Sequence, residues 1–253
     1  MKTKGKKHIL KSKDSLRVIY RLNGTLHVFR FGTTSNAKIA PLGLGIVQSY
    51  HFSKGQFDLA NCGEKITMQS FFEADKDVCF DCPFSVSNGA KLTACYTHKM
   101  QQYSGFLSSL RSINTGLSWD EIPEFSEEIA ADIVTLSKGL YIRFGTYGEP
   151  SLIPLPLMRS LCNVAVTWTG YTHQWAFRPE YSAFLMASCH SEGQAQYAAS
   201  KGWRSFVAAK EGISGLVNCP ASDEAGFKTT CNKCGLCSGA EGKGKKSVWI
   251  LQH

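Results

Sequence analysis

Four cysteines near the C-terminal end constrain this chain more than any other feature. They follow a C-x11-C-x2-C-x2-C pattern. Disulfide bonds pair sulfurs two at a time and seldom join neighbours this close, whereas thiolates at x2 spacing can converge on one inorganic centre. The pattern therefore predicts one bound centre, a [4Fe–4S] cluster with zinc as the alternative metal, held by Cys219, Cys231, Cys234 and Cys237.

The chain has ten cysteines in 253 residues, so disulfide bonding has to be weighed against metal binding. After Ile9 and Leu10 the N-terminal segment returns to charged residues and lacks the apolar core of a signal peptide. No apolar stretch approaches the roughly 20 residues that a membrane helix needs. We therefore expect a soluble protein of a reducing compartment, without a membrane partner, in which clustered thiols bind metal.

Basic residues are concentrated at the N-terminal end. The formal net charge is +8, and residues 1–22 contribute +7 of it through Lys2, Lys4, Lys6, Lys7, Lys11, Lys13, Arg17 and Arg21, against Asp14. A basic arm from Lys2 to Arg21 can bind the phosphates of a nucleic acid. The alternative is a solvated, frayed terminus, because no aromatic residues interleave the lysines.

The first half of the chain contains a hairpin signal and two helix signals. Alternating runs at residues 16–22 and 25–31, joined by Asn23-Gly24, predict a β-hairpin. Apolar residues at helical spacing predict helices over 97–113 and 124–136. The second helix has Ser126, Glu127 and Glu128 on its polar face and stops at Gly139. Before both helices, a loop-rich stretch that leads to Cys62 is predicted from Gly43, Gly45 and Gly55.

The later part of the chain alternates between strand and helix patterns. Strands are predicted at 140–144, 164–168, 184–188 and 203–208, with helices at 155–161 and 191–201 between them. The last helix opens on the capping pair Ser191 and Gln194 and stops at Gly202. Strands separated by single helices imply right-handed parallel crossovers.

The predicted fold class is therefore α/β, with three parts. Residues 1–60 form a basic arm, a β-hairpin and a loop extension. Residues 61–215 form a partial (β/α) barrel that includes a first cysteine group. Residues 216–253 form a cysteine-rich cluster segment.

Polar or metal-capable residues follow three of the predicted strands. They lie in residues 145–150, 170–173 and 189–192. Because the carboxyl ends of parallel strands gather at one edge, we expect these residues to share one face. A lone histidine at a strand end is more often structural than a ligand, so both interpretations stay open for His173 and His190.

A further cysteine group precedes the alternating segment. Cys79, Cys82 and Cys95 follow a C-x2-C-x12-C pattern, which predicts a cluster with three protein ligands and one open iron. Cys62 would be a fourth ligand and would close the site, and a zinc knuckle is the structural alternative. The isolated Cys162 is most simply a small buried hydrophobic residue.

Several short motifs resemble the gene product 88-like family of phage and prophage proteins. They are Ser35-Asn36-Ala-Lys38, Cys95-Tyr96, Met186-Ala-Ser-Cys189, Gly202-Trp203-Arg204, Asn218-Cys219-Pro220-Ala221, the run from Cys231 to Cys237, and the ending Trp249-Ile-Leu-Gln-His253. The resemblance covers most of the chain after about Gly32. It implies a bacteriophage context and the cytoplasm of an infected or host bacterial cell, but no mechanism.

The order of elements is also similar, more distantly, to that of radical S-adenosylmethionine enzymes. These combine a partial α/β barrel, a three-cysteine [4Fe–4S] cluster and a Gly-Gly-Glu-Pro motif that ends the second strand. The present chain has Tyr147 in place of the first glycine of that motif, and C-x2-C-x12-C in place of C-x3-C-x2-C. The resemblance implies that Cys79, Cys82 and Cys95 bind the cluster, and that the methionyl amino group contacts Gly148, Glu149 and Pro150.

Three classes of function are compatible with these patterns. The first is an enzyme with an open cluster and an auxiliary centre at Cys219. The second is a non-catalytic iron–sulfur or zinc protein that binds nucleic acid through its basic arm. The third is a scaffold whose metals only hold loops together. The first is favoured, because a structural metal needs neither strand-end polar residues nor a Gly-Glu-Pro turn.

Overall fold

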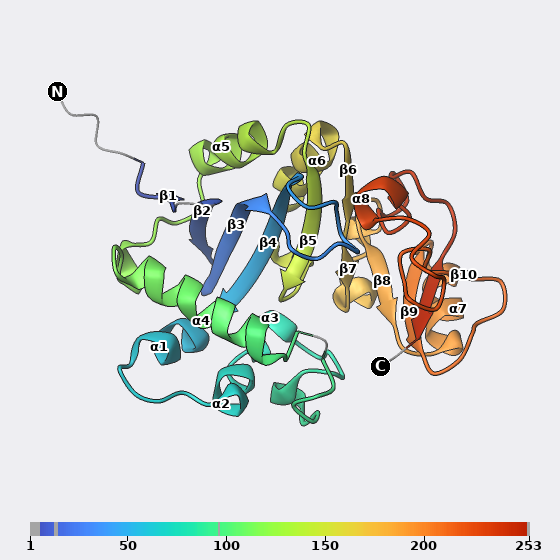
Figure 1. The fold of residues 1–253 in the computed structure, drawn as a ribbon, viewed down its shortest axis with the longest axis horizontal. Helices are drawn as coiled ribbons and strands as arrows, with labels where there is room; N and C mark the ends of the chain where they lie inside the picture. The colour runs from blue at the N-terminus through green and yellow to red at the C-terminus, as the bar shows by residue number, and fades with distance from the viewer. Residues whose placement is uncertain (1–5, 13–14, 96, 252–253) are drawn as a thin grey trace.

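The strands of the molecule form two sheets, and along the chain the second sheet begins where the first one ends. The computed structural model describes residues 6–12, 15–95 and 97–251. Within them, one sheet has six strands in the order β1-β2-β3-β4-β5-β6, and the other has five in the order β10-β11-β9-β8-β7 (Figure 1). Gly170 alone separates β6 from β7 along the chain. The fold is mixed α/β, as the sequence predicts.

The two sheets differ in strand direction. In the six-stranded sheet the first four strands are antiparallel and the pairs β4–β5 and β5–β6 are parallel. All described pairs of the five-stranded sheet are parallel. The strands are β1 (Ile9–Lys11), β2 (Ser15–Leu22), β3 (Thr25–Thr33), β4 (Gly45–Ser53), β5 (Tyr141–Tyr147), β6 (Thr167–Thr169), β7 (Tyr171–Thr172), β8 (Met186–Cys189), β9 (Ser205–Ala209), β10 (Val217–Asn218) and β11 (Val248–Leu251).

Helices connect and cover these strands. They are α1 (Lys54–Asn61), α2 (Met68–Glu73), α3 (Lys76–Cys79), α4 (Met100–Asn114), α5 (Glu127–Ser137), α6 (Leu155–Val164), α7 (Glu192–Ser200) and α8 (Cys231–Cys234). Short 3₁₀ turns occur at Val86–Asn88, Trp119–Glu121, Pro150–Leu152, Gln174–Ala176 and Pro179–Tyr181.

The predicted hairpin is confirmed. Strands β2 and β3 pair in antiparallel register from Ser15↔Gly32 to Leu22↔Thr25. Asn23 and Gly24 connect them with φ of 50° and 75°. Positive φ at both central residues is the geometry that makes Asn-Gly a hairpin turn.

The predicted loop-rich stretch before Cys62 is wrong. Strand β4 lies at the centre of the six-stranded sheet, and α1 follows it from a capping box made by Ser53 and Gln56. The strand was missed because buried polar side chains interrupt its apolar pattern. Gln48, Ser49 and His51 are all buried in β4, and they are satisfied by side-chain hydrogen bonds instead of water.

The other predicted elements are present, with shifted ends and two corrected details. Helix α6 continues to Val164, so β6 starts at Thr167 and not at residue 164. Ser126 is the N-cap of α5 and does not lie on its polar face. Ser191 caps α7 as predicted, but the Gln194 side chain accepts the backbone N–H of His190 at 2.7 Å and does not close a capping box.

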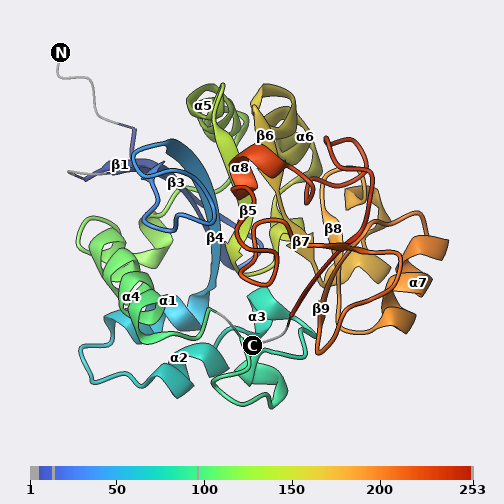
Figure 2. The same ribbon diagram turned by 45° about the vertical axis from the view of Figure 1, so that its right-hand side comes forward.

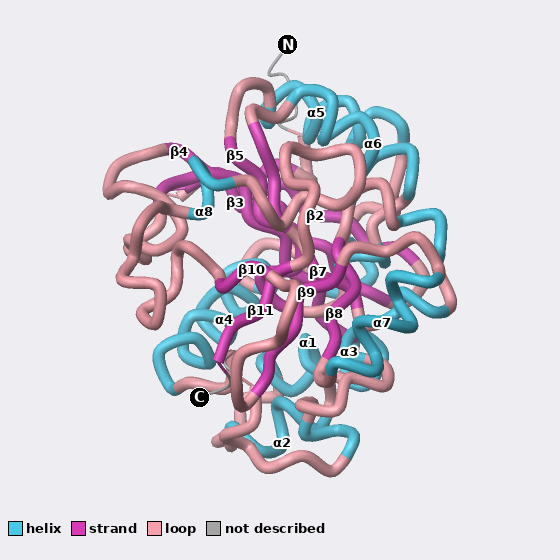
Figure 3. The backbone as a smooth tube through the Cα atoms, turned by 90° about the vertical axis from the view of Figure 1, so that its right-hand side faces the viewer, coloured by secondary structure: helices cyan, strands magenta, loops and turns pink. Residues whose placement is uncertain are grey.

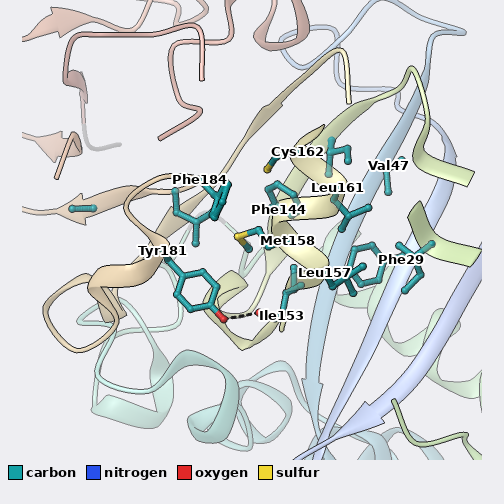
Figure 4. Close-up of a cluster of buried hydrophobic side chains, with 14 of the residues drawn as sticks. Phe29, Val47, Phe144, Ile153, Leu157, Met158, Leu161, Cys162, Tyr181 and Phe184 are labelled. Atoms are coloured by element: carbon teal, nitrogen blue, oxygen red, sulfur yellow. Dashed lines mark hydrogen bonds between the residues drawn. The ribbon is translucent and has the colours of Figure 1, made fainter. Parts of the chain in front are cut away.

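One face of the sheets packs on α5 and α6 through a large apolar core. Figure 4 shows Leu157, Met158 and Leu161 of α6 against Phe144 of β5, with Cys162 among them. Cys162 is buried there, which confirms it as a core residue. The Tyr181 hydroxyl, also in this core, donates to the Ile153 carbonyl at 2.7 Å.

The opposite face carries α1, α2 and α4 over the antiparallel strands and the C-terminal segment over the parallel strands (Figures 2 and 3). Successive side chains of a strand point to opposite faces. Tyr141 therefore packs beside Cys231, whereas its neighbour Ile142 lies in the α5–α6 core. Strands from residues 1–60 belong to the same sheet as β5, so they share these two cores.

None of the helices in the described part of the chain combines the length and the apolar character that crossing a bilayer requires.

Candidate metal centres

The first cysteine group, Cys79, Cys82 and Cys95, lies at the carboxyl ends of the parallel strands. Cys79 is the last residue of α3. The backbone N–H of Glu149, just beyond β5, donates to the Val78 carbonyl at 2.7 Å and holds α3 against that strand end. The cysteines therefore lie at the edge where the sequence predicts functional residues.

The three thiols of this group are close enough to influence one another. Burial raises the pKa of Cys79 well above its ordinary value, and Asp75, Cys82 and Cys95 raise it further. Burial also raises the pKa of Cys82 to about 12, with Cys95 and Glu149 adding to the effect. The structure thus brings the three predicted ligands together in a buried, negatively charged environment.

Cys62 lies apart from this group. It caps the C-terminal end of α1, is exposed, and its thiol contacts the Leu59 carbonyl at 3.1 Å. The structure therefore does not place it as a fourth ligand of the first cysteine group.

The Gly-Glu-Pro turn follows β5 directly and is tightly packed. Gly148 has φ of +75°, and a Cβ built on it would lie 2.8 Å from both Cβ and the carbonyl oxygen of His51. Both the conformation and the space require glycine. Pro150 begins the 3₁₀ turn that follows. The backbone of the turn therefore packs directly against His51.

Glu149 of this turn is a structural acceptor. Its side chain is buried, and its oxygens accept the backbone N–H groups of Ser151 and His173, each at 3.0 Å. Burial raises its pKa, and these hydrogen bonds partly oppose that effect. Glu149 therefore ties the end of β5 to the end of β7.

Tyr147, in place of the first glycine of the motif, joins the turn to the helices before it. Its hydroxyl accepts from Gln56 Nε2 at 2.6 Å and donates to Asp75 Oδ2 at 3.2 Å. Its ring packs against Phe72 and Phe106. The side chain is buried on the α4 face, so this position tolerates a large residue and the turn is anchored by it.

His173 and His190 come together beside the first cysteine group. His173 Nε2 lies 3.6 Å from Cys82 Sγ, and the two imidazole rings stack with their centroids 5.2 Å apart. Burial lowers the pKa of both to about 4, so both rings are neutral near pH 7. Among the described residues neither ring nitrogen of His190 has a hydrogen-bond partner. Both nitrogens are buried.

A cavity of about 260 Å³ adjoins His190 at the ends of β8 and β9. Its walls are residues that turn out of these two strands, namely His190, Glu192, Ala209, Lys210, Glu211, Gly212 and Ile213. The sequence analysis did not single out residues 209–213. A signal for these residues was present in the sequence. Residues 209–213 directly follow the predicted strand 203–208, and functional residues are expected at the carboxyl ends of parallel strands.

The C-terminal cysteine group, Cys219, Cys231, Cys234 and Cys237, is held by backbone hydrogen bonds to three distant segments. Cys219 N donates to Trp249 O at 2.9 Å, Cys231 N to Lys38 O at 2.9 Å, and Gly170 N to Cys237 O at 3.0 Å. Gly235 ends α8 with φ of +63°, and a Cβ there would lie 2.8 Å from Thr167 Oγ1. The glycine lets α8 lie close against β6.

The four thiols of this group also interact. Burial raises the pKa of Cys237 strongly and that of Cys231 to about 11, and the neighbouring thiols of the group raise both further. Burial also raises the pKa of Cys219, and Glu224 adds to that rise. Lys38 opposes the rise at Cys219 and Cys231, and Arg143 opposes it at Cys231. The structure therefore brings the four predicted ligands together beside two cations and one carboxylate.

The donor set suits a cluster. All ten cysteines are free thiols. The Ala221 N–H and the Tyr171 hydroxyl bond Cys219 and Cys237 and favour their thiolate forms. Within the ranges that the structure describes, no three His, Cys, Asp or Glu side chains are arranged to hold a single metal ion. A four-iron cluster is larger than one ion, so its thiols need not converge on one point.

The basic arm is partly engaged in the fold. Lys6 forms ion pairs with Glu128 and Asp132 of α5, and Arg21 pairs with Asp120 and Glu124. In the described part of the arm Lys7 and Lys11 are exposed, Arg17 donates to Ser109 of α4, and Lys2, Lys4 and Lys13 lie outside the described residues.

Comparison with protein-family models, with curated proteins and with solved structures finds no match to this chain. The resemblance to the gene product 88-like family therefore rests on the motifs described above and stays a prediction.

Proposed function

We propose that this chain is a phage-associated iron–sulfur protein with the scaffold of a radical S-adenosylmethionine enzyme. In this proposal the parallel strands from β4 to β9, with β11, form a partial barrel, and the first cysteine group holds a [4Fe–4S] cluster. The observation that carries the proposal is the meeting of that group with the Gly-Glu-Pro turn and His173 at the carboxyl ends of the strands.

An open iron follows from the number of cysteines at this site. Three thiols can ligate three irons of a cluster, and Cys62 is directed to Leu59. A cluster with S-adenosylmethionine supplies one-electron radical chemistry when both are bound. The resemblance to radical S-adenosylmethionine enzymes implies that the backbone at Gly148–Pro150 would hold the amino group of the cofactor.

The cavity beside His190 supports the same proposal. Contacts lead from Cys82 to His173, from His173 to His190, and from His190 into the cavity. A molecule whose amino-acid end lies at the Gly148 turn can extend past these rings into it.

The decisive experiment is anaerobic reconstitution with iron and sulfide. We expect about eight irons per chain and broad absorbance near ~400 nm, a change in the electron paramagnetic resonance signal on adding S-adenosylmethionine, and formation of 5′-deoxyadenosine. Cys82→Ser should abolish the last two effects. Cys162→Ser, which changes a cysteine of the apolar core, should leave them intact. Binding of zinc alone, or a spectrum unaffected by S-adenosylmethionine, would contradict the proposal.

The alternative function is a non-catalytic iron–sulfur or zinc protein that binds nucleic acid through the arm from Lys2 to Arg21. The exposed Lys7 and Lys11 favour it, whereas the ion pairs of Lys6 and Arg21 direct those charges into the fold. Salt-dependent binding without a response to S-adenosylmethionine would support this alternative.

A further inference from the structure

Strand β7 lies between the two cysteine groups. It is short, Tyr171–Thr172, and His173 follows it directly. His173 lies just beyond the strand and opens the 3₁₀ turn Gln174–Ala176. Tyr171 and His173 therefore belong to one short segment, and the side chain of each contacts a cysteine.

Each of these two side chains contacts a different group. The Tyr171 hydroxyl hydrogen-bonds the Cys237 thiol of the C-terminal group. The His173 ring lies 3.6 Å from the Cys82 sulfur of the first group. The route from one group to the other thus consists of two aromatic side chains and the short backbone between them.

The backbone of this route is firmly held. Glu149 accepts the His173 N–H at 3.0 Å, and Gly170 N donates to the Cys237 carbonyl at 3.0 Å. The Tyr171 ring packs on Phe206 of β9, with centroids 4.3 Å apart. Both contacts to sulfur are therefore fixed by the sheet.

The charges around the two groups differ. The side chains of Asp75 and Glu149 lie beside the first group. Lys38 and Arg143 lie beside the C-terminal group, and Arg204, near Cys237, donates to the Leu236 carbonyl at 2.6 Å. Glu224 also lies near Cys219, so cations outnumber carboxylates at this group. Positive charge and hydrogen bonds to sulfur favour the reduced form of a cluster, and negative charge disfavours it. The C-terminal group therefore has the surroundings of an electron acceptor.

We propose that Tyr171 and His173 couple the two cysteine groups for one-electron transfer, with the C-terminal group as the acceptor. This inference rests on the proposed function, since both groups must hold clusters. One electron leaves the reduced centre of the first group and enters the oxidised centre of the C-terminal group. No covalent bond changes, and Tyr171 keeps its proton as the hydrogen-bond donor.

The test uses the full chain with both centres reconstituted. Dithionite, which gives up two electrons per molecule through its SO2•− radical, is added anaerobically in the amount that supplies one electron per chain, and paramagnetic resonance shows which centre holds that electron. We expect it at the C-terminal centre. Tyr171→Phe should lower the equilibrium constant for reducing that centre about tenfold, which is about 59 mV for one electron. Full reduction should give signals broadened by interaction between two nearby spins.

Tyr141→Phe is the matched control. Tyr141 is also buried and lies near Cys231, but its hydroxyl pairs with Thr169 at 2.6 Å and not with a thiol. It should leave the electron distribution unchanged. Equal effects of both variants, an electron that stays at the first centre, or unbroadened signals would overturn the coupling. If the first centre fails to form, or ignores S-adenosylmethionine, the proposed function itself fails.

Discussion

The two cysteine groups have different electrostatic surroundings. The first group has three cysteines beside the side chains of Asp75 and Glu149. The C-terminal group has four cysteines beside Lys38 and Arg143, with Glu224 near Cys219. Thiolates next to carboxylates need a bound cation to be stable, whereas thiolates next to cations are already partly compensated. The comparison teaches that cysteine spacing identifies candidate ligands, while the charges beside them come from distant parts of the chain.

The strongest test of this comparison is to remove one cysteine of a group and measure the bound iron and the stability that remain. Cys234→Ser should lower bound iron by about half and destabilise the C-terminal segment, because metal-binding energy is also folding energy. Iron analysis and thermal melting measure both effects. Cys62→Ser, at an exposed cysteine outside both groups, serves as the control. Unchanged iron and melting in Cys234→Ser would show that the four thiols do not share a centre.

Acid should destabilise the part of the fold that supports the first group. Two buried histidines lie there, and one of them, His51, packs against Gly148 of the Gly-Glu-Pro turn. His51 Nδ1 lies 3.0 Å from His27 Nδ1, and burial lowers the pKa of His51 to about 3 and that of His27 well below its ordinary value. Between pH 6.5 and 3 the unfolded chain binds protons that the folded chain does not, so stability falls as pH falls. At pH 4 His51 alone should cost roughly 3 kcal/mol.

Denaturant titrations at several pH values measure this loss. His51→Asn should be less stable at pH 7 but should show a shallower decline from pH 6.5 to 4. An unchanged slope would mean that other groups cause the acid sensitivity.

A smaller change, which removes no cysteine, should affect the first group and leave the C-terminal group intact. Gly148→Ala places a methyl group 2.8 Å from His51 at a positive φ, and should cost about 1–3 kcal/mol. We expect it to abolish the response to S-adenosylmethionine while the C-terminal centre keeps its iron. Gly89→Ala is the matched control, since Gly89 has φ of +84° with nothing within 4 Å. Equal losses in both variants would remove the special role of the Gly148 turn.

The smallest structural effect is expected at the N-terminal arm, which belongs to neither group. Deleting residues 1–13 should leave the iron content unchanged, weaken nucleic-acid binding and flatten its salt dependence. Filter binding at several salt concentrations, with single- and double-stranded DNA and RNA, measures this. If the intact chain shows no salt-sensitive binding, the arm is a solvated terminus.

Local signals in the sequence were sufficient for the elements whose side chains separate cleanly into apolar and polar faces. Asn23-Gly24 specified its hairpin, and the alternation after residue 140 specified a parallel α/β arrangement. Strand β4 was missed because its polar side chains are buried and bonded to one another, for example Ser49 to His51 at 3.3 Å. Hydropathy cannot distinguish such a strand from a loop.

The site was only partly predictable for a different reason. The spacing of Cys231, Cys234 and Cys237 is local, so it was visible. The contacts of Tyr171 with Cys237 and of His173 with Cys82 join residues 66 and 91 positions apart, and no local pattern encodes such pairs. Strand β11 was missed for the same reason, because its place between β9 and β10 is not encoded by a local pattern.

The position of β11 also sets an order of events during folding. Its residues, Val248–Leu251, follow the C-terminal cysteines in the chain, yet they pair with β9 on one side and β10 on the other. The bond from Cys219 N to Trp249 O forms only once that strand is in place. Domains fold from their N-terminal end as they emerge from the ribosome. The C-terminal cysteines therefore acquire their final arrangement only after β11 has been synthesised and paired, which is later than the six-stranded sheet can form.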